Sequence, residues 1–236
     1  MKKVLISLLI CFNVDAQNID FVVPSAPGGP TDIATRNVIS KLSSTPNLKF
    51  NILYKPGAAQ SIAFQYVEQS TNPTLIIATN AIIDDNLYKT AEQVYHLGSF
   101  SNIFLTNSNS NLKNLNDLDK LSKIRPINFG HGGVGTSSYH AMMKFCDKHD
   151  CIAVPYKGTS QGMVDILNGS IDVYAPVSFG ITNFLDNNYY KSIGKVYIND
   201  NWVILFGKNL SLDNVKSIRK ILGSVDNKFF KDMGLE

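Results

Sequence analysis

Short apolar runs alternate along the chain with segments whose apolar residues recur every three or four positions. Residues 21–23 and 74–79 form continuous apolar runs, which are typical of strands buried on both faces of a sheet. Between them, Ala34, Val38 and Leu42 fall on one helical stripe. Strands that alternate with helices predict βαβ units, and therefore an α/β fold with right-handed crossovers.

The same alternation continues to the end of the chain. It predicts further strands at residues 49–54, 99–106, 126–129, 151–154, 171–175 and 202–207. It predicts further helices at residues 61–69, 137–146, 162–167 and 212–222, a polar segment with a short helix at 107–121, and a closing segment at 226–233.

The order of elements begins again after residue 121, which predicts two similar lobes with a cleft between them. We expect lobe one to comprise residues 17–105 plus 201–236, and lobe two residues 106–200, because the tail is expected to return to the first lobe. Each lobe then holds a parallel or mixed sheet flanked by helices, and the two chain crossings form a hinge.

A glycine-rich loop leads from the strand at 126–129 into the helix at 137–146. It contains Gly130, Gly133 and Gly135, and glycine lets the backbone turn sharply and approach a ligand closely. Thr136, Ser137 and Ser138 follow where the helix begins. One hydroxyl can cap the helix, while the others and the unpaired first-turn amides face an anion. A plain turn is the alternative.

A second loop of this kind follows the first strand. Ala26, Pro27, Gly28 and Gly29 lead into a helix that begins near Pro30, a residue suited to the first helical turn. Ligands of open parallel sheets bind beyond the carboxyl ends of the strands. Both loops lie there, so together they predict a site for one small anion.

The first sixteen residues have the pattern of a secretory signal. Lys2 and Lys3 precede a short apolar run, and Ala16 offers a cleavage site before Gln17. The run is too short to span a bilayer, so residues 1–16 predict an exported, periplasmic protein. The formal net charge of +3 falls to +2 without this segment, which argues against nucleic acid as a partner.

Two cysteines follow the predicted cleavage site. Cys146 and Cys151 flank a short helix-to-strand junction, which favours a disulfide in an oxidising compartment. Two free thiols are an alternative, and so is a metal site with His140 and His149, although the spacing fits no standard zinc pattern. We therefore expect no metal.

Four blocks of the sequence resemble the signature of the periplasmic receptors of tripartite tricarboxylate transporters, the Bug/TctC type. The blocks are residues 23–32, 55–58, 130–138 and 154–158. The resemblance implies a two-lobed, type II-like periplasmic-binding-protein fold. It also implies a monomer without cofactor that closes on a small mono- or dicarboxylate and delivers it to membrane permease subunits.

The resemblance also implies which residues hold the ligand. In lobe one it nominates residues 26–29 and Asp32, with Thr79 and Asn80 after a later strand. In lobe two it nominates Gly130, Gly133, Gly135, Thr136, Ser137 and Ser138, with Tyr156 and Lys157 near the crossing. His131 either donates to a carboxylate or lies in solvent.

Two alternative functions remain open from the residues. A receptor of the same fold can present its ligand to a signalling partner. Residues 158–162 also spell the G-x-S-x-G pattern of a secreted hydrolase with Ser160 as nucleophile. Hydrolases of that class place their histidine after the serine, whereas all four histidines of this chain precede Ser160. We therefore expect a binding protein and not an enzyme.

Overall fold

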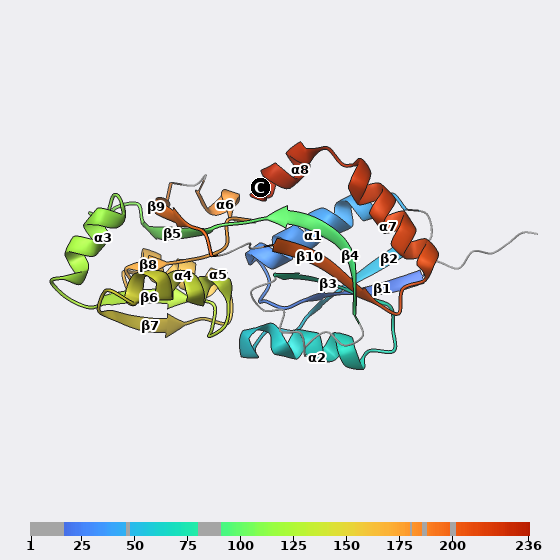
Figure 1. Cartoon of the computed structure of the whole chain (residues 1–236), viewed down its shortest axis with the longest axis horizontal. Coiled ribbons are helices and arrows are strands. Elements are labelled where there is room, and N and C mark those ends of the chain that lie inside the picture. The colour runs from blue at the N-terminus through green and yellow to red at the C-terminus, as the bar shows by residue number, and fades with distance from the viewer. Residues whose placement is uncertain (1–16, 46–47, 80–90, 180, 186–187, 199–201) are drawn as a thin grey trace, which may run out of the picture.

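The computed structural model of the chain describes residues 17–236 apart from 46–47, 80–90, 180, 186–187 and 199–201. The described residues form two five-stranded sheets, and helices flank both. Figure 1 shows the two sheets in separate halves of the molecule, with β4 and β5 leading from one half into the other. The predicted two-lobed α/β fold is therefore confirmed. The predicted signal at residues 1–16 lies outside the described residues.

Lobe one contains a mixed sheet with the spatial order β2-β1-β3-β10-β4. Its strands are β1 (Gln17–Val23), β2 (Leu48–Tyr54), β3 (Thr74–Thr79), β4 (Glu92–Ser99) and β10 (Trp202–Lys208). Strand β1 is parallel to β2 and β3, whereas β10 is antiparallel to β3 and β4. Its helices are α1 (Pro30–Leu42), the short 3₁₀ helix η1 (Ala58–Gln60), α2 (Ser61–Gln69), α7 (Leu212–Ser224) and α8 (Asn227–Asp232).

The apolar run of β3 is buried along its whole length because helices cover both faces of the sheet. Leu75 and Ile77 pack in a cluster with side chains of α1 and α7. Ile76 and Ala78 pack on the opposite face with side chains of α2. Successive side chains of a strand point to opposite faces, so a strand between two helical layers carries apolar residues at every position.

Lobe two repeats this construction with the spatial order β7-β6-β8-β5-β9. Its strands are β5 (Asn102–Asn107), β6 (Ile127–His131), β7 (Cys151–Pro155), β8 (Val173–Tyr174) and β9 (Tyr190–Val196). Its helices are α3 (Leu115–Ser122), α4 (Ser137–Cys146), α5 (Thr159–Leu167) and α6 (Thr182–Leu185). Strand β6 is parallel to β7 and β8, and β5 is antiparallel to β8 and β9.

Two strands are absent from the sequence interpretation, and both are edge strands. Strand β4 lies at one edge of the first sheet and β9 at one edge of the second. Exposed polar residues interrupt both, such as Glu92 and Gln93 in β4. An edge strand of this kind lacks the continuous apolar run that marks a central strand.

The predicted lobe boundary after residue 105 is wrong by a few residues. All of β5 pairs with β9 in the second sheet, so the chain crosses between the lobes at Phe100 and Ser101. The strand predicted to begin at residue 99 therefore begins at Asn102. The chain returns to lobe one between β9 and β10, as expected for two crossings.

The C-terminal residues lie against this crossing. Ser99 and Glu236 exchange backbone hydrogen bonds of 2.8 and 2.9 Å. The hydroxyl of Ser178 donates to the carbonyl of Gly234 at 2.9 Å, and the amide of Ser178 donates to the carbonyl of Ser101 at 2.7 Å. Figure 1 shows the C-terminus at the junction of the two halves. The C-terminal residues are therefore hydrogen-bonded to the segments at the crossing between the lobes.

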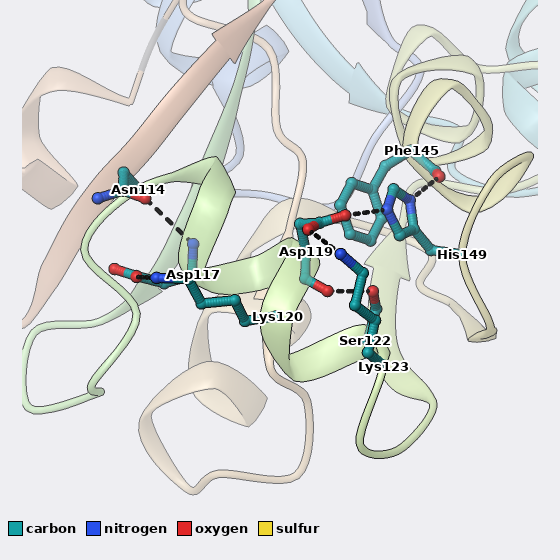
Figure 2. A network of polar contacts seen from close by, with 8 residues as sticks. All are labelled: Asn114, Asp117, Asp119, Lys120, Ser122, Lys123, Phe145 and His149. Atoms are coloured by element: carbon teal, nitrogen blue, oxygen red, sulfur yellow. Dashed lines mark hydrogen bonds and ion pairs between the residues drawn. The ribbon is translucent and has the colours of Figure 1, made fainter.

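A polar network anchors the C-terminal end of α4 to α3 (Figure 2). His149 Nε2 lies 2.7 Å from Asp119 Oδ1, and His149 Nδ1 lies 2.7 Å from the Phe145 carbonyl oxygen. Lys123 donates to the same carboxylate at 2.7 Å. Hydrogen bonds from Lys123 and then His149 lower the pKa of Asp119.

A disulfide closes the same junction between α4 and β7. Cys146 and Cys151 are bonded, with their Cα atoms 5.7 Å apart. The two sulfurs of the alternative metal site are therefore used in this bond, and His149 is held by Asp119 and Phe145. The described residues contain no cluster of three or more histidine, cysteine or acidic side chains arranged to hold a metal ion.

Among the same residues, no helix combines the length and hydropathy that a bilayer span requires.

The disulfide is expected to stabilise the lobe without touching the cleft. Loop-closure entropy for so short a ring gives about 2 kcal/mol, or roughly 4–8 °C in melting temperature for a protein of this size. The double variant Cys146→Ala/Cys151→Ala should melt lower by that amount, as measured by thermal unfolding with and without reductant. An unchanged wild-type melting temperature under reducing conditions would contradict the prediction.

Candidate functional site

A cavity of about 90 Å³ lies between the two lobes. Lobe one contributes the residues after β1, the start of α1, the segment around η1 and the end of β3. Lobe two contributes the beginnings of α4 and α5, and residues 176–179 near the crossing close one side. The cavity therefore lies beyond the carboxyl ends of parallel strands in both sheets, where such sheets bind ligands.

The loop before α4 presents unpaired backbone donors to this cavity. Thr136 caps the helix, because its Oγ1 accepts from the amide of Tyr139 at 3.2 Å and donates to the carbonyl of Gly133 at 2.7 Å. Among the described residues, no group accepts from the amides of Ser137 and Ser138. Both residues line the cavity, so the first turn of α4 offers its free N–H groups to a ligand.

The loop before α1 has a different internal support. Gly28 has a φ of +76°, a backbone conformation that favours glycine. Its amide donates to Asp32 Oδ2 at 2.8 Å. Pro30 and Thr31 line the cavity at the start of α1. The amide of Gly28 is therefore used by the protein itself, whereas the start of the helix faces the ligand space.

A third helix begins at the cavity. Gly158 occupies the N-cap position of α5 without a side-chain cap, and Lys157, Gly158 and Thr159 line the cavity. The sequence indicates a hydrolase-like pattern at residues 158–162 and places Gly158 in a block of the family resemblance, but it nominates no third helix start for the site. The available signal was the strand–glycine–helix order, which is the same order that marked the other two loops.

The two lobes touch beside the cavity. A Cβ atom added at Gly158 would lie 3.0 Å from the Cβ of Ala26. A Cβ atom added at Gly28 would lie 3.7 Å from the hydroxyl oxygen of Ser160. The loop before α1 therefore packs directly on the first turn of α5, and this contact requires small residues on both sides.

The cavity has a positive electrostatic character. Each helix N-terminus acts as roughly half a positive charge, and three helices begin here. Lys157 is the one charged side chain among the described residues that line the cavity. Two lining hydroxyls, Ser25 Oγ and Thr79 Oγ1, are buried with no hydrogen-bond partner among the described residues. Positive ends, a lysine and unpaired hydroxyls suit an oxygen-rich anion.

Five of the residues nominated from the sequence line the cavity, namely Thr79, Thr136, Ser137, Ser138 and Lys157. Gly133 and Gly135 have φ values of +107° and +86° and shape the loop before α4. Ala26, Pro27, Gly28 and Gly29 support the cavity from the neighbouring backbone and do not line it. Asn80 lies outside the described residues.

Asp32 was nominated as a ligand-binding residue, but its carboxylate is turned into lobe one. Its side chain is 4% exposed and accepts from Arg36 Nε at 3.0 Å. It also accepts from the Tyr54 hydroxyl at 2.8 Å and from the amide of Gly28. Asp32 therefore positions the loop before α1. Its negative charge is paired with the guanidinium of Arg36, and the carboxylate does not line the cavity.

His131 is neither solvated nor part of the cavity lining. Its side chain is buried, its Nδ1 accepts from the amide of Gly133 at 3.1 Å, and its ring packs 5.2 Å from that of Tyr139. Burial lowers the pKa of His131. The neutral imidazole thus holds the loop before α4 from behind.

Gly130 and Tyr156 do not line the cavity but pack beneath the residues that do. A Cβ atom at Gly130 would lie 2.6 Å from the ring of Tyr174, so glycine is needed there for packing. The hydroxyl of Tyr156 donates to Asp165 Oδ2 at 2.6 Å, and its pKa is raised by burial and then by that carboxylate.

The remaining lining residues were not predicted. Lobe one adds Pro24, Ser25, Pro30, Thr31, Gly57 and Gln60. Lobe two adds Gly132, Gly158, Thr159 and Tyr174, and the crossing adds Pro176, Val177 and Phe179. Pro24, Ser25 and Gly57 stand in blocks that carried the resemblance. Gln60 and Phe179 carried no sequence signal, since only the folded chain brings them to the cavity.

Comparisons with known proteins agree with this geometry. No protein-family profile matches the chain. A UPF0065 protein of Bordetella pertussis is 25% identical over 191 residues, covering 75% of this chain and 59% of its own length. A second UPF0065 protein, encoded between tcbD and tcbE in a Pseudomonas species, is 22% identical over 170 residues, covering 66% and 51%. The chain thus spans little more than half the length of these relatives.

Solved structures show the same fold. Rpa4515 of R. palustris with adipate matches with a TM-score of 0.82 at 19% identity, over 93% of this chain and 88% of that one. MatC (Rpa3494) from Rhodopseudomonas palustris with bound malate matches with a TM-score of 0.77 at 18% identity, over 92% and 89%. The periplasmic binding protein BugD matches with a TM-score of 0.75 at 19% identity, over 92% and 86%. Together these comparisons show that the chain shares its fold with a periplasmic binding protein and is distantly similar in sequence to UPF0065 proteins.

Replacement of Asp32 should loosen the loop before α1. In Asp32→Asn the three donors of this buried site lose their charged acceptor, and we expect a loss of about 2 kcal/mol in the free energy of unfolding, together with weaker ligand binding. Denaturant titration measures the first effect. Asp213→Asn, in the exposed first turn of α7, is the matched control and should change stability by less than about 0.5 kcal/mol.

His131 should make stability depend on pH on the acid side. Burial lowers its pKa in the folded state below the ordinary value of 6.5, so its stabilising contribution is complete above that value. The contribution is lost as the pH falls through the folded pKa. Melting temperatures between pH 7.5 and 5 should fall less steeply in His131→Gln than in wild type.

His96, whose pKa is also lowered by burial, titrates in both proteins and cancels in this comparison. His140→Gln changes an exposed residue and should keep the wild-type slope. Equal slopes for wild type and His131→Gln would show that the burial of His131 does not govern this pH dependence.

Proposed function

We propose that this chain, whose relatives support a receptor of the Bug/TctC type, is an extracytoplasmic solute-binding protein. It captures a small mono- or dicarboxylate between its lobes and delivers it to the permease subunits of a tripartite tricarboxylate-type transporter. It acts as a monomer in the periplasm after removal of residues 1–16.

One observation carries the proposal: three helix N-termini from two lobes meet around one cavity that has no acidic side chain among its described lining residues. Hydrogen bonds to a charged group contribute about 1.5–3 kcal/mol each. Several such bonds, less an association cost of at least about 4 kcal/mol, suffice for micromolar binding at about 8 kcal/mol.

The cavity volume favours a small acid. About 90 Å³ is small beside the roughly 300–1,000 Å³ of pockets that hold drug-sized ligands. That size supports an acid of only a few carbons. The structural relatives with malate and adipate support the same chemical class.

Lobe closure explains how affinity and delivery are combined. The ligand touches donors on both lobes, so it stabilises the closed arrangement in which Gly158 packs on Ala26. A single lobe offers only part of the donor set. Opening at the hinge therefore releases the ligand to a membrane partner.

Calorimetry and thermal unfolding against a panel of butyrate, succinate, malate, adipate and citrate test the proposal. At least one acid should bind with micromolar affinity and raise the melting temperature, because the cavity supplies anion donors. Dimethyl succinate, which lacks the charges, should do neither. Equal stabilisation by the diester, or its hydrolysis with loss of turnover in Ser160→Ala, would overturn the proposal.

Lys157→Gln should weaken binding of the same acid about tenfold, which corresponds to about 1.4 kcal/mol, because it removes the charged side chain of the lining. Lys148→Gln alters an exposed lysine of lobe two and is the matched control. A wild-type affinity in Lys157→Gln would show that the helix N-termini alone provide the charge recognition.

A further inference from the structure

Tyr174 occupies a slot that two glycines create in lobe two. A Cβ atom at Gly130 would lie 2.6 Å from the Cδ2 atom of Tyr174, and a Cβ atom at Gly162 would lie 2.7 Å from the same atom. Gly130 belongs to β6, next to Tyr174 in the sheet, and Gly162 belongs to α5. The ring is therefore fixed between a strand and a helix, because any larger residue at either position would displace it.

The side chain of Tyr174 borders the cavity beside the first turn of α5. Tyr174 lines the cavity, and so does Thr159, whose side chain hydrogen-bonds the Tyr174 hydroxyl at the first turn of α5. The ring is 1% exposed and packs edge-to-face on Tyr156, with ring centroids 5.8 Å apart.

The charge state of this phenol suits an anion. Burial raises the pKa of Tyr174 to about 12, and the hydrogen bond from Thr159 opposes this only in part. The hydroxyl is therefore protonated at neutral pH and acts as a donor. Among the described residues, Tyr174 is the one tyrosine that lines the cavity.

We propose that Tyr174 is a ligand-binding residue whose hydroxyl donates a hydrogen bond to an oxygen of the bound acid. The inference rests on the carboxylate-binding function proposed above. Because the ring is held between Gly130 and Gly162, the hydroxyl is oriented before the ligand arrives. A pre-oriented donor discriminates among acids by the position of their oxygens, since a buried donor left unpaired is costly.

The test compares Tyr174→Phe with Tyr190→Phe, using the acid of the panel that binds wild type. Both changes remove one hydroxyl from the same core cluster. Tyr190 is buried, its hydroxyl donates to the carbonyl of Met163 at 3.2 Å, and it does not line the cavity. We expect Tyr174→Phe to bind about tenfold more weakly by calorimetry, and Tyr190→Phe to bind like wild type. The two ligand-free variants should melt at similar temperatures.

A spectroscopic readout separates direct contact from an effect on folding. Ligand binding should perturb the ultraviolet absorbance of tyrosine in wild type and Tyr190→Phe, and the perturbation should be lost in Tyr174→Phe. Equal affinities in wild type and Tyr174→Phe, or equal losses in both variants, would overturn the role of Tyr174. Failure of wild type to bind any acid of the panel would instead overturn the proposed function, and this inference with it.

Discussion

The first-turn amides of a helix have no acceptor within the helix, and the cleft of this protein follows from that constraint. The helices α1, α4 and α5 begin at one cavity, and the chain supplies few acceptors for them there. Thr136 satisfies the amide of Tyr139, whereas Ser137 and Ser138 keep free amides among the described residues. The protein thus gathers unsatisfied donors in one place, which is unfavourable without a ligand and favourable with one.

The residues behind the lining hold these donors in position. His131 supports the loop before α4, and Asp32 supports the loop before α1. Both are buried, both accept a hydrogen bond from a backbone amide of their own loop, and neither lines the cavity. Asp32 and His131 support the loops from behind and do not line the cavity, so they contribute little charge to its surface. The polar part of the described lining thus consists of helix starts, hydroxyls, one glutamine and a single lysine.

The sequence was most informative where one local cause dominates. Runs buried on both faces identified β1 and β3, and a glycine-rich turn before a helix identified the loop before α4. The strands β4 and β9 were missed because exposed polar residues interrupt their apolar positions. The position of the crossing at residues 100–101 depends on the pairing of β5 with β9, which are far apart in sequence.

Only part of the candidate site could be predicted from the sequence, namely the residues whose role has a local cause. Hydroxyls at a helix start, such as Ser137 and Ser138, have a local cause, and the structure places them at the cavity. Asp32 and His131 look like ligand-binding residues from their neighbours in the chain. Their true partners, Tyr54 and the packed ring of Tyr139, become evident only in three dimensions. Tyr174 is hidden in a strand, and its role follows from two glycines of other elements.

The contact between Gly158 and Ala26 has a consequence for how this cleft can change over time. Gly158 has no side-chain carbon and Ala26 has one, so the two residues are already close to the smallest pair that a protein can place there. Growth at position 158 can be offset only by loss of the single methyl group at position 26. The closing surface therefore has almost no room for compensating exchange, and new ligand preferences must arise from lining residues away from this contact.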